Sequence, residues 1–182
     1  MGTLLRVSVE GSDRQHGLRA TEAAFAEVRR LEGILSTWDP AAEMARLNAA
    51  PAGRPAAVSP ELFALLVEAE RWAAETGRAF EPVVGPLIDA WDLRGEGRRP
   101  GDARLAEALA AVRAGVELLP GEPALRRAHP DAWIDTGGFG KGAALGAAGA
   151  ALRAAGVARA TLDFGGQVLA IGAPVGEDGW AV

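Results

Sequence analysis

The chain has 182 residues, of which 49% are hydrophobic and 24% charged, and its formal net charge is -5. This length and apolar content suffice for one globular domain with a core, and the acidic balance argues against a nucleic-acid partner. The lack of cysteine excludes disulfides, thiolate metal sites and a cysteine nucleophile. The two histidines, His16 and His129, lie far apart in the sequence, so a histidine-based metal site would need carboxylate ligands.

The chain opens with a predicted strand. Residues 4–10 alternate apolar and polar side chains with a period of about two. A helix follows, because apolar residues then recur at helical spacing. Its buried stripe comprises Ala24, Val28, Leu31 and Leu35. Pro40 ends this helix, since the residue before a proline avoids the helical conformation. A short helix over 42–48 and a loop over 51–55 come next.

Two further helices are predicted in the middle of the chain. The first has Ser59 as its N-cap and Pro60 at its first position, and it ends at Gly77. Its buried face comprises Leu62, Leu66, Ala69 and Ala73. The second follows a polar loop over 95–101 and ends at Gly115. Its apolar positions are Leu105, Ala108, Leu109 and Val112.

The last third of the chain is predicted to hold strands, a glycine-rich run and an alanine-rich helix. In chain order these are a strand over 132–135, the glycine-rich run 136–142, a helix that ends at Gly156, strands over 161–164 and 167–171, and the start of another strand at 179–182. Leu145 and Leu152 share one face of the helix, and Gly165 and Gly166 turn the chain between the two strands. This mixture of helices and strands predicts an α+β fold.

The strand–glycine–lysine–helix segment 134–152 is the most informative part of the sequence. Glycines let the backbone approach a ligand closely, and a helix start offers N–H groups and a dipole to phosphate. Lys141 adds a charge there, and Asp135 can pair with a base, a hydroxyl or a metal shell. A Walker A loop does not fit, because Gly142 follows Lys141 where Ser or Thr is required. A G-x-G-x-x-A pattern over 138–143 fits weakly, and a plain tight turn remains an alternative.

Five sequence blocks carry the strongest functional signal. They are Met1-Gly2-Thr3, residues 35–48 with Ser36-Thr37-Trp38 and Arg46-Leu47-Asn48, residues 77–91 with Phe80-Glu81 and Gly85-Pro86-Leu87, the run Asp135–Gly142, and Asp163-Phe164-Gly165-Gly166. In content and order they resemble the ApbE family of FAD:protein FMN transferases, whose signature D-x-G-[AG]-x-x-K-G is similar to the run 135–142. The resemblance covers essentially the whole chain. It implies a single α+β, ApbE-like FAD-binding domain over 1–182, with a mixed sheet and packed helices, in which the C-terminal part of the family domain is missing.

The resemblance also implies which residues bind FAD and metal, while it assigns no catalytic residue. The implied FAD-binding positions are Met1, Trp38, Arg78, Ala79, Phe80, Glu81, Asp135 and Lys141. Gly138 matches a residue whose backbone carbonyl is a magnesium ligand. An aromatic ring at Trp38 would stack on the flavin or the adenine, and Lys141 would lie near the phosphates. The plain alternatives are a partly buried tryptophan, a solvated surface lysine and, at 78–81, a helix stop followed by an extended segment.

The implied activity is magnesium-dependent transfer of FMN from FAD to a Thr or Ser hydroxyl of a target flavoprotein, with release of AMP. A magnesium ion would neutralise the phosphate oxygens as the pyrophosphate bond breaks. The chain departs from the family pattern at Val83, Gln167 and the residues after Lys141. The family's side-chain magnesium ligands, an Asp and a Thr, lie C-terminal to these blocks, so we expect residues 1–182 alone to be inactive or impaired.

Other functions stay open at this point. The chain is alternatively a catalytically impaired flavin-binding or interaction module of the same family, or an FAD pyrophosphatase that forms FMN and AMP. A dinucleotide-dependent oxidoreductase would require regular β–α units, which the spacing does not show. The sequence shows no apolar run of membrane-spanning length and no signal peptide. Members of the family are commonly exported and anchored, so the compartment stays open, a cytoplasmic one included.

Overall fold

The computed structural model describes residues 3–11, 13–119 and 121–181. Its internal contacts divide the chain into two compact units. Unit 1 combines the residues up to Gly33 with those from Phe139 onward, and unit 2 comprises Ile34–Gly138. Each unit is described by itself, and the expectation of a single domain over 1–182 stays a prediction.

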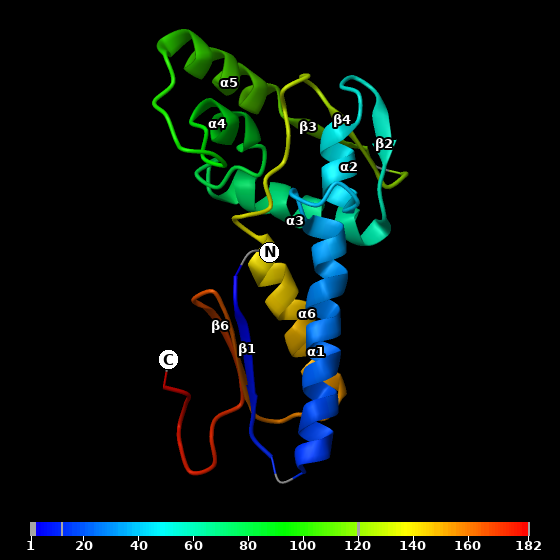
Figure 1. Ribbon diagram of the computed structural model, residues 1–182. Helices are drawn as coiled ribbons and strands as arrows, with labels where there is room; N and C mark the ends of the chain where they lie inside the picture. Colours follow the sequence, from blue (N-terminus) through cyan, green and yellow to red (C-terminus); the bar gives the residue numbers. More distant parts are fainter. Residues whose placement is uncertain (1–2, 12, 120, 182) are drawn as a thin grey trace. The chain divides into compact units, whose positions relative to one another are not determined.

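Unit 1 is built on an antiparallel three-stranded sheet in the order β1-β5-β6 (Figure 1). Its elements are β1 (Leu5–Val9), α1 (Arg14–Leu35, the last two residues in unit 2), α6 (Gly140–Ala154), β5 (Ala160–Phe164) and β6 (Gln167–Ile171). Leu5 pairs with Phe164 across β1 and β5, and Ala160 pairs with Ile171 across β5 and β6. Helix α6 packs on β5 and β6 through its buried apolar face, which includes Leu145.

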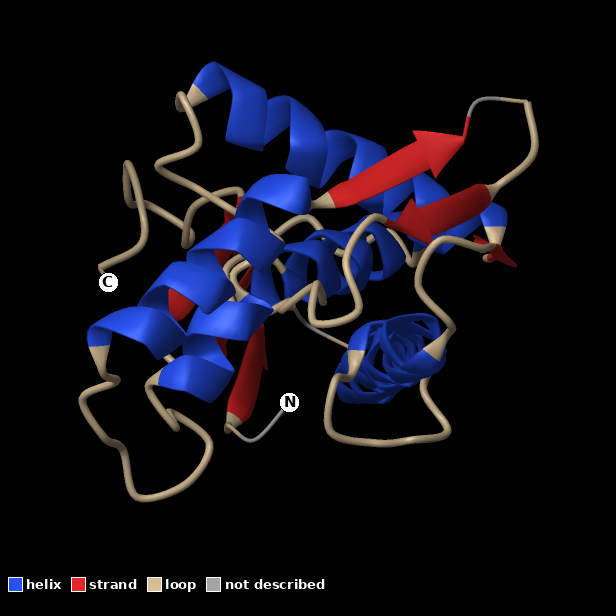
Figure 2. Ribbon diagram, turned by 90° about the horizontal axis from the view of Figure 1, so that it is seen from above, coloured by secondary structure: helices blue, strands red, loops and turns tan. Residues whose placement is uncertain are grey.

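Unit 2 holds the remaining helices and a second antiparallel sheet in the order β2-β4-β3, whose short strands are the arrows at one edge of Figure 2. Its elements are α2 (Glu43–Ala49), β2 (Pro55–Ala57), α3 (Pro60–Glu75), α4 (Gly85–Ala90), α5 (Asp102–Ala114), β3 (Val116–Leu119) and β4 (Ala124–Arg127). Helix α4 packs against α5. The α+β prediction is confirmed.

The predicted helix boundaries are largely confirmed, because their capping residues act as expected. Ser59 accepts a hydrogen bond from the Leu62 N–H at 3.2 Å and caps α3. Gly115 caps the C-terminus of α5 with a φ of 69°, a conformation that favours glycine. Helix α4 and the strands β2, β3 and β4 were not predicted, and the expected loop over 51–55 runs into β2 at Pro55.

Two predicted strands are wrong. Residues 132–135 belong to no sheet. Instead, the Asn48 side chain receives the Ile134 N–H on Oδ1 and donates from Nδ2 to the Ile134 carbonyl, both at 2.9 Å. The Asp135 N–H donates to the Pro82 carbonyl at 2.9 Å. A side-chain amide therefore replaces the neighbouring strand. Residues 179–181, within the described part of the chain, also form no strand.

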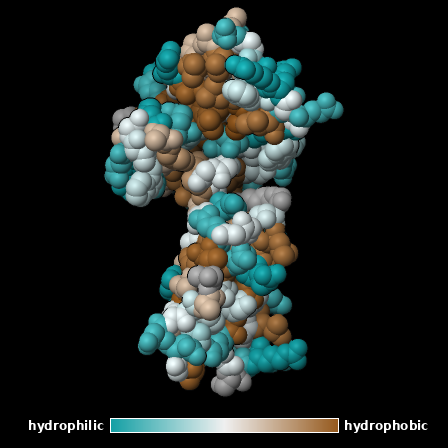
Figure 3. Space-filling view, turned by 90° about the vertical axis from the view of Figure 1, so that its left-hand side faces the viewer, coloured by the Kyte–Doolittle hydropathy of each residue, from teal (hydrophilic) through white to brown (hydrophobic). Residues whose placement is uncertain are grey.

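Apolar side chains reach the surface in both units, and Figure 3 shows apolar surface interspersed with polar surface. The exposed large ones are Leu4, Leu18, Trp38, Val67, Trp72, Trp91, Leu93, Val168 and Val175. Single exposed apolar residues are normal in soluble domains, but Trp38 is 70% exposed and belongs to a sequence block with an implied function. Among the described helices, none is both long enough and apolar enough to cross a bilayer.

Candidate functional site

The glycine turn that follows Ile134 closes around the Asp135 carboxylate. Asp135 Oδ1 accepts the Gly137 N–H at 2.8 Å, and the Thr136 hydroxyl donates to the Leu35 carbonyl at 2.9 Å. A Cβ atom on Gly137 would lie 2.7 Å from Asp135 Oδ1, and one on Gly138 would lie 3.0 Å from a Phe80 ring carbon. A side chain at either position would require Asp135 or Phe80 to shift, which explains part of the glycine-rich run.

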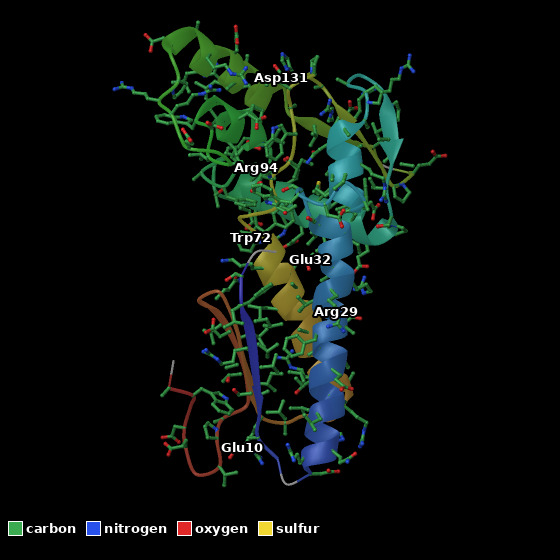
Figure 4. The ribbon with its side chains drawn as sticks, in the orientation of Figure 1. Glu10, Arg29, Glu32, Trp72, Arg94 and Asp131 are labelled. Atoms are coloured by element: carbon green, nitrogen blue, oxygen red, sulfur yellow. The ribbon has the colours of Figure 1, made fainter. Side chains whose placement is uncertain are left out.

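Arg94 is the partner of Asp135. Its Nη2 lies 2.9 Å from Asp135 Oδ2 in an ion pair whose side chains are 26% and 18% exposed. The same nitrogen donates to Thr37 Oγ1 at 2.6 Å, and Nη1 donates to the Thr37 carbonyl at 3.2 Å. Arg94 thus joins the turn after α1 to the glycine turn. Figure 4 labels Arg94 on the segment that follows α4.

Two tryptophans flank the Arg94 guanidinium. Its Cζ atom lies 4.3 Å from the ring centre of Trp38 and 4.5 Å from that of Trp133, both within the range of cation–π contacts. Trp133 is held in place, because its Nε1 donates to Asp89 Oδ2 at 2.7 Å and its ring fills the space over Gly85. Trp38 keeps most of its ring open to solvent.

The backbone that carries Trp38 is fixed by a buried serine. Ser36 is 8% exposed, and its Oγ accepts the N–H groups of Trp38 at 3.2 Å and Asp39 at 3.1 Å. The Asp39 carboxylate accepts the Ala41 N–H at 2.9 Å. These side-chain-to-backbone bonds form a tight turn at the end of α1. The backbone that carries the exposed Trp38 indole is therefore held in place by hydrogen bonds.

The 78–81 segment is held by its own ion pairs. Arg78 has a φ of +65°, rare for a residue with a side chain. It pairs with Glu81 at 2.6 Å and Glu70 at 2.9 Å, and the hydrogen bond that Arg78 donates to Glu81 raises the pKa of Arg78. Glu81 also accepts the Val83 N–H at 2.9 Å. The side chains of Arg78 and Glu81 are thus bonded to each other, and they line a cavity of about 470 Å³ with residues of α4 and α5.

Phe80 connects this segment to the glycine turn. Its N–H donates to Thr76 Oγ1 at 3.1 Å, and its ring lies against Gly138. Ala79 donates its N–H to the Thr76 carbonyl at 3.1 Å. Among the predicted residues, Phe80 therefore lies against Gly138. Trp38 and Asp135 are linked by Arg94, which contacts both.

Two further residues of the 35–48 block bind other segments of unit 2. Asn48 holds the segment before Asp135 through Ile134, as described above. Arg127 in turn donates to the Asn48 carbonyl and, at 3.0 Å, to the Pro130 carbonyl. Burial lowers the pKa of Arg127. Glu43 accepts the hydroxyl of Ser59, the α3 cap, at 2.8 Å.

Met1 and Lys141 are not among the described residues of unit 2. Met1 lies outside the described residues. Lys141 lies in the first turn of α6 in unit 1, whereas Gly138 is the last residue of unit 2. In the described part of the chain, no three His, Asp or Glu side chains are grouped to hold a metal ion. Gly138 as a magnesium ligand stays a prediction.

Arg94 and Trp133 were not predicted as site residues from the sequence. Arg94 lies in a polar loop with several arginines, 41 residues before its partner Asp135, and no motif distinguishes it. Trp133 stands two residues before Asp135, so its closeness in the sequence to a predicted site residue could have indicated its place in the cluster. Both complete a cluster of one carboxylate, one guanidinium and two indoles within unit 2.

The fold is that of solved ApbE proteins. The ApbE protein of Thermotoga maritima superposes with a TM-score of 0.82 at 26% identity, over 97% of this chain and 58% of its own. The flavin transferase ApbE of Vibrio cholerae gives a TM-score of 0.78 at 23% identity, over 95% of this chain and 57% of its own. The ApbE family model matches residues 1–182, and the chain belongs to the ApbE family.

Curated relatives carry the name FAD:protein FMN transferase. The one from Rhodobacter capsulatus is 34% identical over 176 residues, which is 94% of this chain and 33% of that protein. The one from Klebsiella pneumoniae is 29% identical over 179 residues, which is 94% of this chain and 51% of that protein. The chain thus spans between a third and about half the length of these relatives.

Proposed function

We propose that this chain supplies the FAD-binding part of an FAD:protein FMN transferase. The proposed reaction is magnesium-dependent: FMN passes from FAD to a Thr or Ser hydroxyl of a target flavoprotein, and AMP leaves. The observation that carries the proposal is the exposed Trp38 ring beside the Arg94–Asp135 ion pair. In the glycine turn that follows Asp135, a side chain at Gly137 or Gly138 would crowd Asp135 or Phe80. Family membership supports it.

The residues of the cluster suit the parts of a flavin dinucleotide. The open face of Trp38 is a stacking surface for a planar heterocycle, and Asp135 is an acceptor for a ring N–H or a ribose hydroxyl. Lys141, which lies in the first turn of α6 in unit 1 and is not part of this cluster, stays a predicted phosphate-binding residue. The Gly138 carbonyl is a hard oxygen ligand of the kind that magnesium prefers. Magnesium would neutralise the charge that builds on the phosphates.

Titration of FAD into the protein, followed by flavin fluorescence and calorimetry, tests the binding step. Trp38→Ala is expected to weaken FAD binding by about two- to tenfold, since a stacked ring contributes about 0.5–1.5 kcal/mol beyond its burial. Trp72→Ala is the matched control, because Trp72 is also an exposed tryptophan of unit 2, 48% exposed, on α3. Equal affinity of the Trp38 variant and the wild type would contradict the proposal.

The fate of FAD separates transfer from its alternatives. Incubation with FAD, magnesium and a Thr-containing acceptor flavoprotein, followed by chromatography and protein mass spectrometry, measures AMP and protein-bound FMN. AMP with bound FMN supports the transferase, and AMP with free FMN supports an FAD pyrophosphatase. FAD binding without AMP release is the outcome expected of residues 1–182 alone, and it agrees equally with a catalytically impaired binding module. The last candidate gains weight from the departures at Val83, Gln167 and the positions after Lys141.

A further inference from the structure

We propose that Arg94 is a positioning residue of the FAD site, which holds Trp38 and Asp135 in the arrangement that receives the flavin dinucleotide. The inference rests on the proposed function and adds a residue that lies outside the five sequence blocks. Arg94 contacts two segments that are distant in the sequence, the turn of Thr37 and Trp38 and the segment of Trp133 and Asp135.

The loop that carries Arg94 is itself fixed. The Arg98 N–H donates to the Trp91 carbonyl at 2.8 Å, and the Gly97 N–H donates to the Asp92 carbonyl at 3.0 Å. Asp92 has a φ of +52°, and a Cβ on Gly95 would lie 2.7 Å from the Asp92 carboxylate. The chain therefore makes a hydrogen-bonded turn after α4, and Arg94 lies within this turn.

The shape of the guanidinium group matches this place. Its N–H donors lie in its plane and reach Thr37 and Asp135, while its flat delocalised surface suits contact with indole rings. A lysine ammonium is a point charge without a planar fork, so it cannot make all of these contacts at once. The requirement at this position is therefore for arginine and not only for a positive charge.

Two consequences for the ligand follow. Trp38 is 70% exposed, but its contact with Arg94 holds the ring in one orientation. Less side-chain entropy is therefore lost when a ligand ring stacks on Trp38. The positive charge also compensates Asp135. Without Arg94, an unpaired carboxylate would repel the phosphates of FAD.

The test compares Arg94→Lys and Arg94→Ala with the wild type in FAD titrations. Arg99→Lys is the matched control, because Arg99 is an exposed arginine a few residues further along the chain. We expect both Arg94 variants to bind FAD at least about fivefold more weakly and to quench flavin fluorescence less. Affinity and quenching of Arg94→Lys within twofold of the wild type would overturn the proposal, since charge alone would then suffice.

A measurement without FAD keeps the inference separate from the proposed function. The indole N–H signals in ¹H–¹⁵N spectra report the surroundings of each tryptophan, and Trp38→Phe and Trp133→Phe assign the two signals of the cluster. Arg94→Lys is expected to shift both signals while those of Trp72 and Trp180 stay in place. Unchanged Trp38 and Trp133 signals would refute the positioning role. Failure of the wild type to bind FAD would instead refute the proposed function and leave the spectral comparison decisive for Arg94.

Discussion

At the scale of single residues, Asn48 shows how a residue of a sequence block acts through the backbone of another segment. Its amide gives Ile134 both the donor and the acceptor that a neighbouring strand would supply. Ile134 is 1% exposed, so water cannot replace these bonds. The position of Asp135 therefore depends on a side chain that comes from α2, far away in the sequence.

Asn48→Ala is predicted to destabilise the protein by about 2–4 kcal/mol, because it leaves two buried backbone groups of Ile134 without partners. Urea unfolding followed by circular dichroism measures the change in the free energy of unfolding. Gln15→Ala is the control, since it removes an amide from an exposed position of α1 and should change stability by less than about 0.5 kcal/mol. A loss below 1 kcal/mol for Asn48→Ala would mean that Ile134 finds other partners.

Residues with a local pattern were easier to predict than residues defined by distant contacts. The Ser59 cap, the Gly115 stop and the Gly165-Gly166 turn each follow from a few neighbouring residues, and the structure confirms them. Arg94 has no such signature, because its function in the cluster depends on contacts with Thr37 and Asp135 that only the fold creates.

At the scale of elements, Gly146 and Gly149, two of the glycines of α6, lie in different surroundings. Gly146 is exposed, and a Cβ atom there would meet no atom within 4 Å outside the local helix backbone. Gly149 is buried, and a Cβ there would lie 3.1 Å from Leu169 Cδ2 of β6. The first glycine only weakens the helix, whereas the second lets α6 approach the sheet closely.

Gly146→Ala is predicted to stabilise the protein by about 0.5–1 kcal/mol, because alanine restricts the unfolded chain and favours helix. Gly149→Ala gains the same propensity, but the crowding against Leu169 costs about 1–3 kcal/mol, as overpacking usually does. Thermal and urea unfolding of the two variants gives their stabilities side by side. Equal stabilisation by both changes would show that Leu169 moves aside without cost.

Sequence periodicity correctly predicted those elements that are long enough for the apolar pattern to repeat several times. Helices α1 and α3 span 22 and 16 residues, and their apolar stripes match the buried positions. The strands β2 to β4 have only 3 or 4 residues and show no clear alternation. Residues 132–135 were predicted as a strand, because their sequence does not reveal that the backbone of Ile134 bonds to the amide of Asn48.

At the scale of the whole molecule, the two units differ in how the chain assembles them. Unit 2 is one continuous stretch, Ile34–Gly138, whereas unit 1 needs both ends of the described chain. Its strand β1 pairs with β5, in a register that places Leu5 opposite Phe164. The hairpin of β5 and β6 is local, because only Gly165 and Gly166 separate the two strands.

This difference predicts an order of folding. Contacts between residues distant in the sequence form slowly, because the intervening chain must first be closed into a loop. During refolding from urea, amides of α3 in unit 2 and of the β5–β6 hairpin should gain protection before those of β1. Pulsed hydrogen–deuterium exchange with peptide mass spectrometry measures this order. The β6 peptide is the internal control, since it belongs to the same sheet as β1 but pairs locally. Protection of β1 that is simultaneous with that of α3 would show that the chain ends meet early and that sheet β1-β5-β6 takes part in the first folding step.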